Sequence, residues 1–182
     1  MLYEIDVAAN RAARKWTRRE LAGRVFWAAA RPWFRFSPRP FWGWRRWLLR
    51  LFGARIGTNV QIFPSVLVSI PWNLSIGEGS GIGDRVILYA LGPITLGKSV
   101  TISQGAHLCA GTHDWSRPDR PLLKLPITIG DNSWICADAF VGPGVTVGAS
   151  SILGARAVAM KDIAPGVVAV GNPARPARQK KI

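Results

Sequence analysis

A six-residue repeat is the feature that most narrows the folds open to this chain of 182 residues. An aliphatic residue, usually followed by glycine, recurs at every sixth position, and a second apolar or small residue precedes it by two positions, as Ala54 precedes Ile56. Because residues two apart on an extended strand point the same way, each pair faces one interior. The guide positions of the repeat are Ile56, Ile62, Val68, Ile76, Ile82, Leu88, Leu96, Ile102, Leu108, Ile129, Ile135, Val141, Val147, Leu153 and Ala159.

Six residues make one short strand and one turn, so three repeats close a triangular coil of about 18 residues. The fifteen guide positions predict five coils, stacked at about 4.8 Å each into a prism of roughly 24 Å. Glycines that follow guide residues, such as Gly57 and Gly77, suit sharp corners at which a side chain would clash. The sequence thus predicts an all-β fold, a parallel β-helix over residues 54–164.

A polar, proline-rich segment interrupts the repeat. Successive guide residues are six or eight positions apart elsewhere, but Leu108 and Ile129 are separated by twenty-one. The extra residues cannot enter the prism, so we expect residues 109–128 to protrude as a loop. Loops of this length with little structure of their own are uncommon and are usually functional or disordered, and a decorative surface insertion is the alternative. Trp115 and three leucines in the second half of the segment argue for an ordered loop packed against another part of the protein.

The N-terminal segment, residues 1–53, has a different character. Of the 24 Lys and Arg residues, 13 lie within positions 1–55, together with 3 of the 10 acidic residues and six of the nine tryptophans. We expect helices over residues 14–30 and 41–52, joined by a loop. In the first of these helices, the residues spaced for one helical face are Leu21, Val25, Ala28 and Ala29.

Two interpretations of this segment remain open. It closes the open end of the β-helix as a helical cap, or residues 14–52 form a basic, tryptophan-rich surface that lies on anionic lipid. The net charge of +14 also raises nucleic acid as a partner. No motif that reads nucleic acid is found, and the excess charge is mixed with bulky aromatic residues, so we expect no nucleic-acid partner.

The chain carries no run of about 18 apolar residues that could span a bilayer. Its first residues lack the charged start and apolar run of a secretory signal. Two cysteines, Cys109 and Cys136, are too few for a disulfide framework. We therefore expect a cytoplasmic protein, and the lipid interpretation would place it peripherally at the inner face of the cytoplasmic membrane.

Several short motifs resemble a known family. "FGARIG", "ISQGAHLCAGTHD", "PITIGDNSWI", "VGPGVTVG" and "VAVGNPAR" are similar to the hexapeptide-repeat acyltransferases, in the maltose, galactoside and nodulation acetyltransferase branch, and most of all to acetyltransferases of colanic-acid or exopolysaccharide biosynthesis. The resemblance spans about residues 45–180. It implies a left-handed β-helix, a homotrimer, and acetyl-CoA bound as acyl donor in the groove between two prisms.

The resemblance implies that His113, in the interrupting loop, is the general base that deprotonates an acceptor hydroxyl. An imidazole of ordinary pKa, about 6.5, is mostly neutral near pH 7 and still accepts a proton. Asp114 could orient the ring, but side chains of adjacent residues seldom hydrogen-bond to each other, so two roles are expected for it: binding the acceptor or capping a turn. Trp115 beside it is assigned to the acceptor site. His107 lies on the outward face of its strand, where it contributes to the acceptor site or, as we expect, is exposed to solvent. Two histidines cannot supply a metal site from one copy, so no metal is expected.

Further residues match the family by position. Trp134, Ala137 and Ala155 match positions that line the acetyl and pantetheine groove, and Lys161, Arg175 and Arg178 match cationic positions near the nucleotide phosphates. The tail, residues 165–182, thereby contributes to the cofactor site. Met160 replaces a hydroxyl residue common in the family.

Arg85 and Tyr89 match acceptor-contacting positions in the coil before the loop. Arg85 replaces an asparagine of the galactoside and maltose type, which leaves room for a larger or anionic acceptor.

We therefore expect an acetyl-CoA-dependent O-acetyltransferase acting on a saccharide acceptor in surface polysaccharide biosynthesis, with the acceptor attached to a lipid carrier if the segment binds membrane. The alternatives are an amino-sugar N-acetyltransferase of the same fold and a non-catalytic β-helix scaffold at the membrane.

Overall fold

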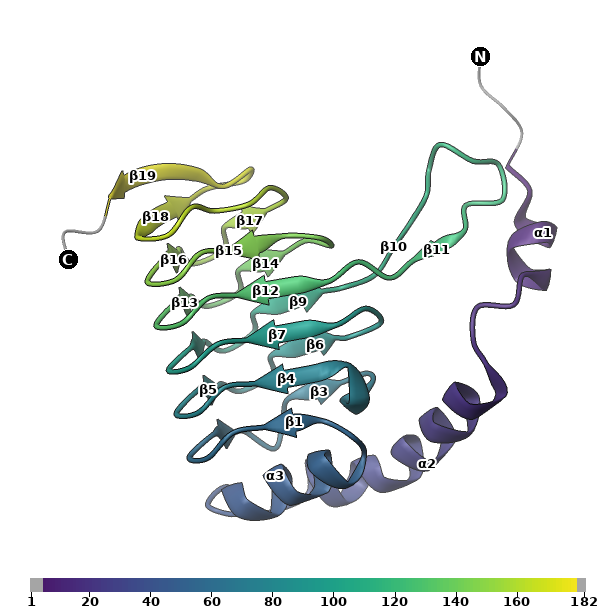
Figure 1. Ribbon diagram of the computed structural model, residues 1–182, viewed down its shortest axis with the longest axis horizontal. Helices are drawn as coiled ribbons and strands as arrows, with labels where there is room; N and C mark the ends of the chain where they lie inside the picture. The colour runs from purple at the N-terminus through teal and green to yellow at the C-terminus, as the bar shows by residue number, and fades with distance from the viewer. Residues whose placement is uncertain (1–4, 180–182) are drawn as a thin grey trace.

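A computed structural model describes residues 5–179, with only the backbone of residues 178 and 179, as a triangular prism closed at one end by helices (Figure 1). Sheet A comprises β1 (Arg55–Ile56), β4 (Leu74–Ile76), β7 (Ile94–Leu96), β12 (Ile127–Ile129) and β15 (Thr146–Val147). Sheet B comprises β2 (Gln61–Ile62), β5 (Gly81–Ile82), β8 (Thr101–Ile102), β13 (Trp134–Ile135), β16 (Ile152–Leu153) and β18 (Val167–Val170), with β19 (Arg175–Gln179) added antiparallel. Sheet C comprises β3 (Leu67–Val68), β6 (Ile87–Tyr89), β9 (His107–Cys109), β14 (Phe140–Val141) and β17 (Val158–Ala159).

The repeat determines the core as predicted. All fifteen guide residues are buried, and each pairs with its equivalent one coil away, as Ile56 pairs with Ile76 and Ile76 with Leu96. The parallel β-helix and its five coils are confirmed. A partial sixth coil follows, in which Ile163 bridges to Val147 and β18 pairs with β16.

Glycine after a guide residue serves close packing between coils. A Cβ built on Gly77 would lie 2.4 Å from the carbonyl carbon and oxygen of Gly97 in the next coil. No side chain fits at that separation, and the neighbour is backbone that cannot move aside. The expected clash at the corners is confirmed here.

Two helices, α2 (Arg18–Arg35) and α3 (Trp42–Leu51), lie across the first coil, whereas α1 (Val7–Ala12) lies beside the interrupting loop. A short 3-10 helix, η1 (Pro71–Asn73), follows the first coil. Each coil donates backbone N–H groups to carbonyl oxygens of the following coil, as Gly57 N donates to Ile76 O at 2.8 Å. No coil precedes the first one, so its own carbonyl oxygens receive no hydrogen bond of this kind.

Side-chain donors from α2 and α3 satisfy these carbonyls on all three faces. They are Arg50 Nε to Ile56 O (3.0 Å), Arg45 Nε to Ile62 O (2.5 Å) and Trp27 Nε1 to Val68 O (2.8 Å). Part of the basic and aromatic character of the segment is therefore consumed in closing the prism.

The predicted helix over residues 14–30 was wrong at both ends and in its buried face. Thr17 and Glu20 form a capping box, which starts α2 at Arg18, and the helix continues through Pro32 to Arg35. The predicted face of Leu21, Val25, Ala28 and Ala29 is exposed. Trp27 and Phe34, on the opposite side, pack onto the prism because their larger rings fill the open end of the core. The second predicted helix, 41–52, agrees with α3 to within one residue at each end.

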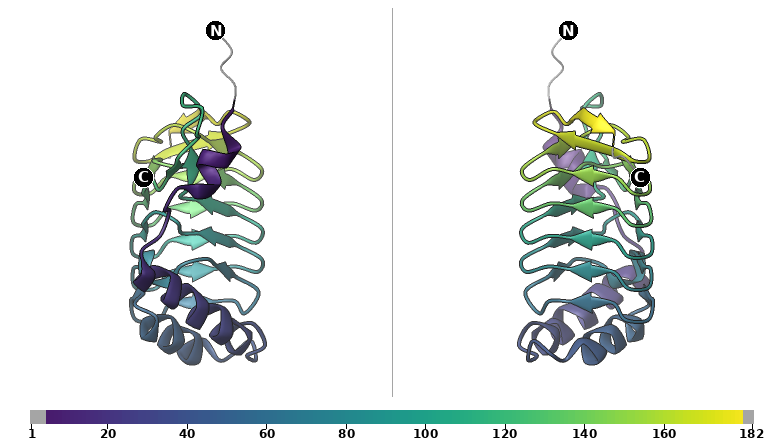
Figure 2. Two further views of the ribbon diagram at one scale, coloured as in Figure 1. Left: turned by 90° about the vertical axis from the view of Figure 1, so that its right-hand side faces the viewer. Right: turned by 90° about the vertical axis from the view of Figure 1, so that its left-hand side faces the viewer.

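The interrupting loop protrudes, as expected, and is ordered as a hairpin of β10 (Thr112–His113) and β11 (Leu122–Leu123). Its partner is the N-terminal segment: Asp6 N donates to Pro118 O at 3.0 Å, and Lys124 Nζ lies 3.7 Å from the centre of the Trp16 ring. Figure 2 shows α1 alongside the loop, connected to α2 at the far end of the prism.

Candidate active site

The hairpin leaves the prism at one particular corner. β9 belongs to sheet C and β12 to sheet A, so the loop between them extends from the corner where these two sheets meet (Figure 1). His113 pairs with Leu122 and Thr112 with Leu123 in antiparallel register. This pairing gives the strand that carries His113 a fixed backbone.

The imidazole of His113 is oriented by a main-chain carbonyl. Its Nδ1 lies 2.7 Å from the carbonyl oxygen of Arg120, at the other side of the hairpin tip. A carbonyl oxygen can only accept, so Nδ1 carries the proton and Nε2 presents a lone pair. The side chain is exposed and lines a cavity of about 280 Å³ together with residues of α1 such as Val7 and Asn10. The ring is thus held in the tautomer that a general base requires.

Asn10, which no sequence pattern marks, supports this arrangement from α1. Its Nδ2 donates to the carbonyl oxygens of Asp119 and Arg120, both at 2.7 Å, and its Oδ1 accepts from Lys15 Nζ at 2.7 Å. These contacts join segments more than 100 positions apart, and no sequence motif marks them.

Asp114 caps a turn in the loop. Its Oδ1 accepts from Ser116 Oγ at 2.5 Å and from Ser116 N at 2.9 Å. The Ser116 hydroxyl, and then its N–H, hold the pKa of the Asp114 carboxyl below its ordinary value, so the group is ionised near neutral pH. Of its two expected roles, the turn cap is observed. Trp115 is 81% exposed beside it.

The expected pantetheine positions lie at a different corner, between sheets B and C. Ala137 and Ala155 stack one coil apart there, and Arg156 N donates to Ala137 O at 2.9 Å. Trp134 projects outward from sheet B and donates from Nε1 to Ser103 Oγ at 2.8 Å. Small residues leave room along this corner, and Trp134 provides an aromatic wall.

Arg85 continues the same corner toward the helices. It has a left-handed φ of 58°, as do Asp138 and Arg156 at equivalent positions higher up. Sequence spacing could have shown this stacking, because equivalent positions of the repeat must coincide once the insertion is subtracted.

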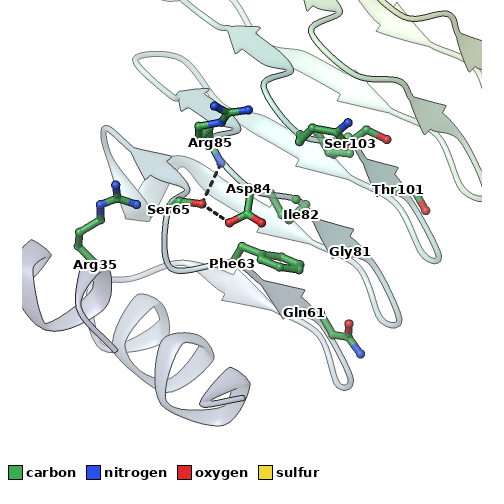
Figure 3. A pocket seen from close by; sticks show the side chains of 13 residues that line it. Arg35, Gln61, Phe63, Ser65, Gly81, Ile82, Asp84, Arg85, Thr101 and Ser103 are labelled. Atoms are coloured by element: carbon green, nitrogen blue, oxygen red, sulfur yellow. Dashed lines mark hydrogen bonds between the residues drawn. The ribbon is translucent and has the colours of Figure 1, made fainter. Parts of the chain in front are cut away.

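Arg85 lines a groove of about 750 Å³ (Figure 3). Ser65 Oγ donates to Asp84 Oδ1 at 2.6 Å and accepts from Arg85 N at 2.9 Å, which fixes the turn. Arg35, at the end of α2, lines the groove from the side of the helices, and Ser103 lines it toward Trp134. The groove therefore offers two guanidinium groups at one end and hydroxyl groups along its length.

The remaining predicted residues divide between the two regions. Tyr89 and Lys161 lie at the corner of sheets C and A, where the loop departs, and both are exposed. Met160, beside Lys161, is also exposed. Arg175 and Arg178 lie in β19, beyond the top of sheet B, and the backbone of Arg178 pairs with Val168.

His107 differs from expectation. Its ring lies on the outer face of sheet C between Tyr89 and Phe140, with centroids at 6.3 and 5.3 Å, and is only partly exposed. Among the described residues, its Nε2 is buried without a hydrogen-bond partner. Burial lowers the pKa of His107 below its ordinary value. The expectation of a solvated side chain was wrong, because aromatic neighbours one coil away on either side cover the ring.

Within one chain, the expected base, His113, and the expected donor groove are therefore on separate corners of the triangle. His113, Tyr89 and Lys161 share one corner, whereas Trp134, Ala137 and Ala155 follow the next. A site that uses both sets is complete only where a corner of one prism meets the other corner of a second copy.

Comparison with known proteins identifies the family. The chain is 43% identical over 157 residues to a putative colanic acid biosynthesis acetyltransferase of Escherichia coli K12, covering 86% of each protein. The chain belongs to the hexapeptide-repeat acetyltransferases. It is also 33% identical to the galactoside O-acetyltransferase of the same organism over 138 residues, which is 74% of this chain and 68% of that protein. No protein-family model matches the chain.

Solved structures give the same assignment. A galactoside acetyltransferase in complex with coenzyme A superposes with a TM-score of 0.73 at 26% identity, covering 96% of this chain and 89% of that one. A hexapeptide-repeat acetyltransferase of Vibrio cholerae, complexed with acetyl coenzyme A, has a TM-score of 0.85 at 24% identity, covering 93% of each chain, and supports the fold alone. The protein is accordingly a left-handed β-helix and an acyltransferase.

Within residues 5–179, no three His, Cys, Asp or Glu side chains are grouped so as to hold a metal ion. In the same residues, no helix is both long and apolar enough to cross a membrane.

Proposed function

We propose that this acyltransferase is an acetyl-CoA-dependent O-acetyltransferase of a saccharide, active in surface polysaccharide biosynthesis, with His113 as the general base of a direct transfer. The observation that carries the proposal is the 2.7 Å contact of His113 Nδ1 with the Arg120 carbonyl, which leaves Nε2 as the lone-pair nitrogen. The named relatives, a putative colanic acid acetyltransferase and a galactoside O-acetyltransferase, support the acceptor class.

In the proposed reaction, Nε2 of His113 removes the proton from an acceptor hydroxyl while that oxygen forms a bond to the thioester carbonyl carbon. The carbon–sulfur bond then breaks, and the imidazolium returns the proton to the leaving thiolate. The products are an acetyl ester and the free thiol, so His113 ends in its starting state. A hydroxyl is a poor nucleophile without such a base, so removing the imidazole removes most of the rate.

We propose a homotrimer, because the two parts of the site lie on different corners of one chain. The corner with Trp134, Ala137 and Ala155 would receive the donor's pantetheine arm, and the neighbouring copy would supply His113. Lys161, Arg175 and Arg178 would meet the nucleotide phosphates, for which cations are suitable partners.

The acceptor is proposed to lie near Asp114, Trp115 and Tyr89 of one copy and Arg85 of its neighbour. The guanidinium groups of Arg35 and Arg85 in one groove favour a larger or anionic saccharide over a small neutral sugar. We further propose that the protein acts at the inner face of the cytoplasmic membrane, which residues 14–52 contact, on an acceptor attached to a lipid carrier.

The test of the base is His113→Ala, compared with His107→Gln at the other histidine of the chain. The His113→Ala protein should lose acetyl transfer by about 10²- to 10⁴-fold while still binding acetyl-CoA. The His107→Gln protein should keep most of its activity. Full activity of His113→Ala would remove the base assignment, and an intact wild-type protein that does not bind acetyl-CoA would favour a scaffold. Acetylated amines in place of esters would indicate an N-acetyltransferase.

The shared site is tested by mixing two inactive variants, His113→Ala and the groove-blocking Ala137→Trp. In a mixed trimer at equal amounts, about a quarter of the sites combine an intact base with an intact groove, so activity should return to that level. If the mixture stays inactive although the subunits exchange, the base and the groove do not cooperate across copies.

A further inference from the structure

Helix α2 has two apolar faces, and the prism covers only one. The inner face places Gly23, Trp27 and Phe34 against the first coil and η1. The outer face, on the opposite side of the helix, presents Val25 and Trp33, which are 68% and 70% exposed. An exposed large apolar surface of this kind is unusual on a soluble monomer and marks an interaction site.

The apolar surface continues beyond the end of α2. Phe36, 84% exposed, and Phe41 flank the connection to α3, and Trp44 and Trp47 stack at 5.0 Å on its outer side. Trp33, Phe36, Phe41 and Trp44 line an apolar hollow of about 580 Å³. The exposed apolar residues of α2, α3 and their connection are here called the aromatic patch: Val25, Phe26, Trp33, Phe36, Phe41, Trp44 and Trp47.

The charged residues of the segment that carries the aromatic patch are almost all positive. Arg18, Arg19, Arg31 and Arg35 of α2 are exposed, and in residues 18–55 the only acidic residue is Glu20, which lies on the side of Lys124. The arginines of α3 are engaged in closing the prism, as described for Arg45 and Arg50. The exposed arginines of α2 therefore add positive charge at this end of the prism, where α2 also carries Val25 and Trp33.

The position of the aromatic patch also suits contact with a flat surface. The patch lies at the end of the prism opposite to β19 (Figure 1). In a trimer whose axis runs along the prisms, three such ends would face one side. The loop that carries His113 departs after the third coil, about 15 Å from that end.

We propose that the aromatic patch is the face that docks on a bilayer of anionic lipids, with its aromatic rings in the headgroup region and Arg18, Arg19 and Arg31 of α2 on lipid phosphates. Tryptophan and arginine in one exposed face suit this environment, because the ring has an apolar body and the cations attract the negative surface. The inference deepens the proposed membrane contact by naming the side chains that make it, and it does not depend on the acetyl-transfer chemistry.

The experiment is sedimentation of the full-length protein with vesicles of phosphatidylcholine, with and without phosphatidylglycerol. The wild type should bind the anionic vesicles and bind neutral ones at least tenfold more weakly. The double variant Trp33→Ser/Phe36→Ser should lose at least tenfold in partition, whereas Val170→Ser, an exposed apolar residue at the other end of the prism, should not. Arg31→Glu should weaken binding by fivefold or more, at about fivefold for each basic charge removed. Arg55→Glu, on the outer face of sheet A, should weaken it less.

Failure of binding by the wild type, or equal binding of the Trp33→Ser/Phe36→Ser protein, would overturn the proposal. A change in oligomer mass in that double variant would instead assign the surface to a contact between copies. The two proposals fail separately: His113→Ala should keep vesicle binding, and Trp33→Ser/Phe36→Ser should keep acetyl transfer to a soluble saccharide without vesicles.

Discussion

Asn10 in α1 donates from its side-chain amide to the carbonyl oxygen of Arg120, at 2.7 Å, and that same oxygen holds Nδ1 of His113. The N-terminal segment is thereby coupled to the loop that carries His113, although three coils of the β-helix lie between them in sequence. A residue outside the family motifs thus positions the proposed base.

Asn10→Asp should lower the turnover number about five- to tenfold, because it replaces two N–H donors, each contributing about 0.5–1.5 kcal/mol, with an acceptor beside two carbonyl oxygens. The KM for acetyl-CoA should stay within about twofold. Steady-state kinetics measure both, with Arg11→Ala, an exposed neighbour in α1, as the control. An unchanged turnover number would mean that the loop is held without Asn10.

Arg45→Met should lower the free energy of unfolding by about 2–4 kcal/mol. The fully buried guanidinium donates to Ile62 O and Pro38 O, and methionine would leave these oxygens without a donor. Arg39→Met removes an exposed ion pair with Asp84 and should cost less than about 1 kcal/mol. Denaturant unfolding of both proteins gives the comparison, and equal losses would contradict the capping role of Arg45.

Gly77→Ala and Gly81→Ala, four positions apart, should differ sharply. A methyl group on Gly77 would overlap the Gly97 backbone and should cost about 1–3 kcal/mol or more, whereas Gly81 has no atom within 4 Å of a built Cβ. Gly81→Ala should be neutral or slightly stabilising, because alanine restricts the unfolded chain. Thermal unfolding of the two variants distinguishes them, and a well-folded Gly77→Ala protein of wild-type stability would refute the steric argument.

His107 should make stability depend on pH. Burial lowers its pKa in the folded state, so the unfolded chain binds the proton first as the pH falls below the ordinary value of about 6.5. The stability associated with the neutral ring is fully present above that pH and decreases below it. Between pH 7.5 and 5.5, the unfolding temperature of the His107→Gln protein should therefore fall less than that of the wild type. If the unfolding temperatures of the two proteins fell in parallel over this range, His107 would bind its proton equally well in the folded and the unfolded state.

The six-residue spacing of aliphatic side chains was enough to predict the β-helix, because that spacing has one way to bury them all. It also placed the loop, since an insertion cannot enter a closed coil. Family motifs selected His113, and the repeat register is enough to stack Arg85 in one column with Asp138 and Arg156.

The folded structure was needed to show which face of α2 is buried, since Trp27 and Val25 both lie on apolar faces and the choice depends on the shape of the open prism end. It also revealed Asn10 behind the Arg120 carbonyl, and the burial of His107 between Tyr89 and Phe140. These residues are brought together by the fold and not by the six-residue repeat, so local sequence patterns do not predict their contacts. The separation of the base from the donor groove has the same origin: a triangular coil places neighbours in the repeat on different corners, and packing brings together only residues that are a whole coil apart.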